Sequence, residues 1–135
     1  MLLAGCMPIE KQNPFIDPHC LLSQSQCQVT LALGTFDILF NVHTVVPEQE
    51  FKIIVKSKSP NKNLEIKGFL EGKDMYMGKI PLLFTQNQPQ IFSASTMLGS
   101  CSEKEMIWRM WLIIVDINHP EKIQKVFIDF KSFRH

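Results

Sequence analysis

Two short stretches of the sequence carry sulfur side chains that could bind a soft metal ion. Met75 and Met77 alternate by two, so on an extended backbone their thioethers point to the same side. Cys101 and Met106 flank a polar loop that precedes a long apolar segment. The four side chains supply three thioethers and one thiolate, and soft sulfur ligands select Cu(I) over harder ions. The sequence therefore predicts a Cu(I) site made of Met75, Met77, Cys101 and Met106.

Hydrophobic packing is the alternative interpretation of the same methionines. Methionine is a flexible side chain that fills irregular gaps in protein cores, and Met75, Met77 and Met106 could cap one end of the fold in this way. The chain has no His-x-His, no Cys-x-x-Cys and no regular Cys and His spacing of a zinc site. The two interpretations differ in whether the four sulfur atoms converge on one point.

The remaining cysteines affect the same site. Cys20 and Cys27 are close enough in sequence for a disulfide that joins the N-terminal segment to the first predicted strand. This pairing leaves Cys101 available as a ligand. In the alternative pairing, Cys20 or Cys27 is bonded to Cys101, which removes Cys101 from any metal site.

Composition and missing motifs exclude several classes of function. The chain of 135 residues is 45% hydrophobic and 20% charged, as is usual for one folded domain. Its 14 basic and 13 acidic residues form no basic stripe, which argues against nucleic-acid binding. No Gly-x-Ser-x-Gly, phosphate-binding glycine loop or nucleotide fingerprint is present, and Asp37 and Asp116 are too isolated for paired-carboxylate catalysis. We therefore expect a protein that is not an enzyme.

The segments that must position these residues have the sequence pattern of β-strands. Short apolar runs alternate with turn signals at the spacing of a β-sandwich. Pro81 confines its segment to an edge or a bulge, and Gln86 to Pro89 reads as a turn. We expect an immunoglobulin-like antiparallel β-sandwich of seven or eight strands over residues 27–135, without a helix. The expected strands cover residues 28–33, 36–42, 50–56, 64–70, 79–85, 91–97, 106–116 and 123–130.

Alternation within the expected strands separates core side chains from outer ones. The segment 106–116 is the most apolar, and it directs Trp108 and every second residue after it to one face. Arg109 lies on the other face, either stacked on an aromatic ring or as a solvated charge. Trp111 and Phe127 are out of phase with the inward faces of their strands, which makes them candidate anchors for a partner.

The N-terminus resembles the end of a bacterial lipoprotein signal peptide. The resemblance rests on the lipobox Leu3-Ala4-Gly5-Cys6. It implies that residues 1–6 are the remnant of a signal peptide, that Cys6 is lipidated, and that the membrane anchor is durable. Residues 7–26 contain prolines and read as an extended tether. Met7 rather than Asp follows the cysteine, which in this family is compatible with the outer membrane.

The domain itself resembles periplasmic copper-associated sandwiches of the FixH and YtkA-like type. The resemblance covers roughly residues 45–116 and rests on Gly-x-x-Met-x-Met-Gly, a Gly-containing turn and a Trp-bearing strand. It matches Met75 and Met77 to the Met-containing loop of that group and Trp108 to its Trp-bearing strand. Those proteins usually hang from a transmembrane helix, and Cys101 with Met106 has no firm match among them.

Two functions follow as expectations. The first is a periplasm-facing envelope lipoprotein that binds or delivers Cu(I), or assists maturation of a copper-containing respiratory enzyme. The second is a metal-free protein–protein interaction module of a secretion, pilus or lipoprotein assembly, because sandwich edges pair readily with partner strands. Both imply a membrane attachment through the lipid, an oxidising compartment in which disulfides persist, and no nucleic-acid partner.

Overall fold

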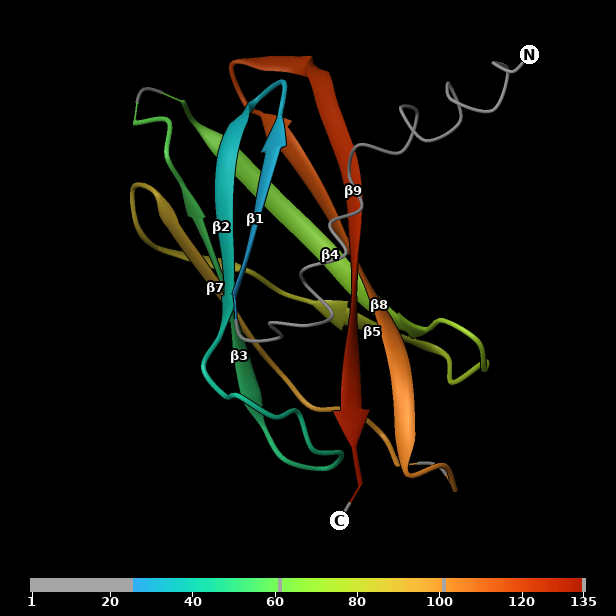
Figure 1. The fold of residues 1–135 in the computed structure, drawn as a ribbon. Helices are drawn as coiled ribbons and strands as arrows, with labels where there is room; N and C mark the ends of the chain where they lie inside the picture. The colour runs from blue at the N-terminus through green and yellow to red at the C-terminus, as the bar shows by residue number, and fades with distance from the viewer. Residues whose placement is uncertain (1–25, 61, 101, 135) are drawn as a thin grey trace, which may run out of the picture.

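The computed structural model describes residues 26–60, 62–100 and 102–134 (Figure 1). Within these residues the chain forms nine strands and no helix. None of the described residues belongs to a helix that could cross a membrane. Cys6 and the expected tether at residues 7–26 lie outside the described part, except for Gln26, which is the first residue of β1. The strands are β1 (Gln26–Leu31), β2 (Gly34–Phe40), β3 (Phe51–Ser57), β4 (Leu64–Gly72), β5 (Lys79–Leu82), β6 (Thr85–Gln88), β7 (Ile91–Thr96), β8 (Glu105–Asp116) and β9 (His119–Phe133).

The strands form two packed sheets, which confirms the expected all-β sandwich. One sheet has the order β1-β2-β3-β7-β6, and the other has the order β5-β4-β8-β9. Neighbouring strands pair antiparallel in both sheets. Figure 1 shows the long β8–β9 hairpin running along the length of the domain.

The core lies between the sheets and includes the side chains that alternation directs to one face of β8. In β8 every second residue from Met106 to Ile114 is buried, and in β3 Phe51, Ile53 and Val55 are buried. Phe40, Phe51 and Phe130 contact one another with ring centroids 5.0 to 6.4 Å apart. These contacts join strands of both sheets, so the hydrophobic burial that stabilises the fold is shared between them.

The prediction was wrong about the segment between β4 and β7. Residues 79–85 were expected as one strand and residues 86–89 as a turn. Instead β5 ends at Leu82, the chain crosses to the other sheet, and Thr85–Gln88 forms β6 against β7. All four residues of β6 are polar and exposed, which is the composition of a turn. They nevertheless form an edge strand, because their backbone pairs with β7. The ladder shifts register between Gln86 and Gln88.

Side-chain and loop contacts hold the end of the sandwich that contains Trp108. The indole N–H of Trp108 donates a buried hydrogen bond to the hydroxyl of Ser132 at 3.1 Å. Val45, in the loop between β2 and β3, forms a parallel bridge with Ser132 and accepts a hydrogen bond from the N–H of Phe133 at 2.9 Å. The loop is thereby fixed against β9, and it covers part of the outer edge of that strand.

Candidate functional site

The methionines expected as metal ligands lie in two hollows at one end of the sandwich. Met75 and Met106 line a hollow of about 290 Å³ that also contains three carboxylate residues, Asp74, Glu103 and Glu105. Met106 is buried and belongs to the core, which is the packing role considered above, whereas Met75 is 38% exposed.

Met77 lines a second hollow, of about 600 Å³, together with Met97, Gly99 and Trp108. A Cβ atom added to Gly99 would lie 4.0 Å from the terminal methyl carbon of Met77, so the side chain of Met77 lies beside the segment that follows β7. The structure thus brings Met75 to Met106 and Met77 to Met97. Sequence reasoning missed Met97 as part of this hollow, because it was assigned to the expected strand at residues 91–97, whereas β7 ends at Thr96.

The cysteines of the predictions fall largely outside the described residues. Cys101 is outside them, and so are Cys6 and Cys20. Cys27 lies in β1, is buried and is disulfide-bonded. Both pairings considered for Cys27 involve cysteines outside the described part, so both stay predictions. No group of three or more His, Cys, Asp or Glu side chains that could hold a metal ion occurs among the described residues.

A row of aromatic rings crosses the outer face of the sheet that contains β8. Phe69, Trp111 and Phe127 are opposite one another in the strand register, with ring centroids 6.3 and 5.0 Å apart. The guanidinium of Arg109 lies 3.9 Å from the ring centroid of Phe127 and forms two hydrogen bonds with the carboxylate of Asp129. This hydrogen bonding raises the pKa of Arg109 above its ordinary value. Arg109 is therefore the stacked residue rather than a free surface charge.

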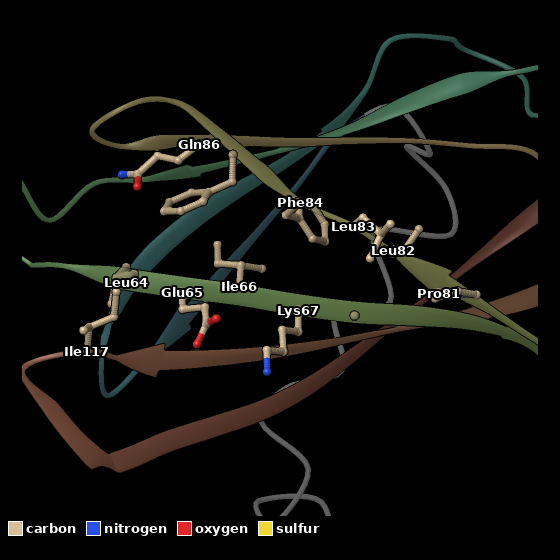
Figure 2. Close-up of a pocket in the computed structure, with 12 residues that line it drawn as sticks. Leu64, Glu65, Ile66, Lys67, Pro81, Leu82, Leu83, Phe84, Gln86 and Ile117 are labelled. Atoms are coloured by element: carbon tan, nitrogen blue, oxygen red, sulfur yellow. The ribbon is translucent and has the colours of Figure 1, made fainter.

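A third hollow, the β4 groove, opens between the two sheets. It has a volume of about 550 Å³, and five consecutive residues of β4, from Leu64 to Gly68, line it. Successive side chains of a strand point to opposite faces, so five consecutive residues can line one hollow only along the strand's edge. Figure 2 shows Ile66 directed across the groove toward Phe84, while Glu65 and Lys67 point away.

The edge is open because β5 is shorter than β4. The ladder between β5 and β4 covers only Gly68 to Glu71, opposite Leu82 to Lys79. Beyond Leu82 the chain leaves this sheet and becomes β6 of the other one. Within the described residues, no strand therefore pairs with Leu64–Lys67 on the side opposite β8.

Two backbone hydrogen bonds at the ends of β4 identify which peptide groups face the groove. Before β4, the carbonyl of Asn63 accepts a hydrogen bond from the N–H of Ile117 at 2.8 Å. After β4, the N–H of Lys73 donates a hydrogen bond to the carbonyl of Ile107 at 2.9 Å. Both bonds point toward the β8 side, and the β4–β8 register between them is continuous. Residues along a strand direct their N–H and C=O groups to alternate sides. The peptide groups of Leu64 and Ile66 therefore face the groove.

The groove combines this backbone edge with apolar surface. Its floor contains buried side chains, among them Leu64, Ile66 and Phe92, and its rim carries two exposed apolar residues. Leu83 is 80% exposed and Ile117 is 54% exposed. β6 also lies at a sheet edge, but all four of its side chains are exposed and polar. The β4 edge is thus accompanied by apolar surface in a way that the β6 edge is not.

Comparisons with known proteins show what the chain is similar to. No protein-family model and no curated protein matches the sequence. A protein of the DUF4426 family from Pseudomonas aeruginosa is similar in structure, with a TM-score of 0.54 and 13% identity over 82% of this chain and 96% of that one. A DUF4785 family protein from Legionella pneumophila has a TM-score of 0.56 and 10% identity over 74% of this chain. The similarity is one of fold.

The second of these similarities is partial, since the match spans only 28% of the Legionella protein. At identities of 10% and 13% the comparisons carry no residue-level correspondence. Any functional conclusion must therefore be argued from the side chains and backbone groups of this chain.

Proposed function

We propose that this domain is a protein–protein interaction module that binds an extended polypeptide segment in the β4 groove by strand addition. The observation that carries the proposal is the open edge at Leu64 and Ile66, whose peptide groups face an apolar groove. In strand addition, main-chain hydrogen bonds supply affinity, and pockets for alternate side chains supply specificity. The groove offers both elements along the same four residues of β4.

The proposal includes the setting inferred from the sequence. The lipobox ending at Cys6 supports a lipid-anchored domain that faces the periplasm, and Met7 after the cysteine favours the outer membrane over the inner one. A domain held at a membrane surface by a tether is suited to capture a segment of a neighbouring envelope protein, because the anchor raises the effective concentration of both partners.

A neutral peptide tests strand addition directly. The probe is the octapeptide Ser-Thr-Val-Thr-Ile-Thr-Val-Ser, acetylated and amidated at its ends. Its binding is measured by the changes that it causes in the amide chemical shifts of the isotope-labelled protein. We expect the shifts to concentrate on Leu64 to Lys67. Replacing Leu83 by Lys (Leu83→Lys) should weaken binding by about tenfold, because an apolar contact at the rim is lost and its removal costs about 1.5 kcal/mol or more.

Two controls separate the groove from general stickiness. Ile123→Lys makes the same kind of change at an exposed residue that lines a different hollow, and it should leave the affinity unchanged. The second control is the same peptide with methylated backbone nitrogens at its two Val residues and its Ile. It keeps all its side chains but cannot donate main-chain hydrogen bonds from these residues to β4, so it should not bind. Equal binding of the methylated peptide would contradict strand addition.

A second candidate function is Cu(I) binding at the methionine end. The observation that favours it is that Met77 and Met97 line the same hollow beside Trp108. Met75, two residues before Met77 in the turn after β4, lines the other hollow together with Met106. Thioether sulfur is a ligand type that suits Cu(I), so these residues fit the metal by chemistry. The domain would then bind or deliver Cu(I), or assist maturation of a copper-containing enzyme.

Thermal unfolding with and without Cu(I), under anaerobic conditions, tests the copper candidate. A ligand that binds only the folded state, at a free concentration of a hundred times its Kd, stabilises that state by about 2.7 kcal/mol. The Tm should therefore rise when Cu(I) is added. Substituting both Met75 and Met77 by Leu should abolish this rise, because Leu keeps the volume and removes the sulfur. Met110→Leu, in the buried core, is the matched control. A rise that survives in the double variant would exclude these residues as ligands.

A further inference from the structure

We infer that the segment bound in the β4 groove comes from a different polypeptide and reads acidic–apolar–basic–apolar from its N-terminal end. This inference rests on the proposed function and adds the chemistry of the partner. It follows from the charges beside the open edge and from the direction of the vacant strand position.

The charges are Glu65 and Lys67, which flank Ile66. Both are exposed, and neither has an ion-pair partner among the described residues. Their neighbours on the β8 side are Val115 and Ile113, which are apolar. A strand added on the open side would place its own side chains directly opposite them, where opposite charges stabilise a pair and like charges destabilise it.

The vacant position continues the line of β5. Every strand pair in the two sheets is antiparallel, and β5 ends with Leu82 opposite Gly68. A segment that continues this line in the same direction meets Lys67 first, then Ile66, Glu65 and Leu64. An acidic residue therefore faces Lys67, and a basic residue two positions later faces Glu65. The residues opposite Ile66 and Leu64 point into the groove, whose floor is apolar.

A second copy of this chain fits the edge poorly. In the antiparallel register that places Glu65 opposite Lys67 of the copy, Leu64 meets the copy's Gly68, and that edge of Gly68 is already paired with Leu82. In the next register, which pairs Leu64 with Ile66, the two Glu65 side chains lie directly opposite each other. Like charges in that position are destabilising. The edge therefore favours a segment of a different sequence.

Two hexapeptides of identical composition test the inference. The probes are acetylated and amidated Ser-Glu-Ile-Lys-Val-Ser and its charge-exchanged isomer Ser-Lys-Ile-Glu-Val-Ser, titrated against the labelled protein. We expect the first to bind about threefold or more tightly than the second, with amide shifts at Leu64 and Ile66. In the double variant Glu65→Lys with Lys67→Glu the preference should be reversed, and both substituted side chains are exposed, so the fold is retained.

The outcomes distinguish this inference from the proposed function. Equal affinities for the two hexapeptides, with shifts still at Leu64 and Ile66, would overturn the charge pattern and leave strand addition standing. No shifts at these residues with the octapeptide or with either hexapeptide would overturn both. Concentration-dependent dimerisation with the same residues broadened would show that the occupant is a second copy, and would overturn the assignment to a different polypeptide.

Discussion

Replacing Trp108 by Ala is expected to lower the free energy of unfolding by about 3–5 kcal/mol, the usual cost of removing a large buried aromatic side chain. Trp108 is 1% exposed and is among the largest fully buried side chains of the core. The substitution also leaves the buried hydroxyl of Ser132 without the indole N–H that donates to it at 3.1 Å. Because a domain of this kind is stable by only about 5–15 kcal/mol, urea denaturation should show a clearly lowered midpoint.

Trp111 provides the matched control, because it lies on the same strand and points to the other face. It is partly exposed, its indole N–H donates to the carboxylate of Glu71 at the sheet surface, and its ring lies in the outer aromatic row. Trp111→Ala should therefore cost less than half as much as Trp108→Ala. A loss of 1 kcal/mol or less for Trp108→Ala would contradict the central packing role given to this end of the core.

The architecture could be predicted where one physical effect dominates. In β3, β8 and β9 one face is buried, so the alternation of apolar residues indicates the strand. The three expected strands, and the inward face predicted for the segment that forms β8, are confirmed. β6 could not be predicted in this way. Its four residues are exposed on both faces, and they form a strand only because their backbone pairs with β7. Edge pairing of this kind leaves no pattern of hydrophobicity in the sequence.

The candidate site was predictable only in part, for a related reason. Pro81 correctly indicated an edge strand, since proline has no backbone N–H to donate to a neighbouring strand. The groove itself depends on where β5 ends and on the crossing to the other sheet, and no residue type in the Leu82–Phe84 run signals that change. Spacing by two suggested that Met75 and Met77 share one site. In the turn after β4 they line different hollows, because that turn is not an extended strand.

Amide hydrogen exchange in the free protein should reveal the open edge before any partner is known. The N–H groups of Glu65 and Lys67 face β8, whereas those of Leu64 and Ile66 face the groove, where no strand of the described chain pairs with them. We expect Leu64 and Ile66 to exchange at least about a hundredfold faster than Glu65 and Lys67. That ratio corresponds to an opening free energy of about 3 kcal/mol for the paired amides.

Gly68 and Leu70 supply the internal control for this measurement. They lie on the same side of β4 as Leu64 and Ile66, but β5 covers them, with Leu82 and Ile80 opposite. Their amides should exchange slowly, so the contrast within one strand edge would mark the residue at which β5 ends. Uniform protection from Leu64 to Leu70 would mean that the edge is already paired in solution. If the edge is open, binding of an added strand should slow exchange at Leu64 and Ile66 but not at Gly68 and Leu70. Within the described residues no strand pairs with the first two amides, whereas β5 already pairs with the other two.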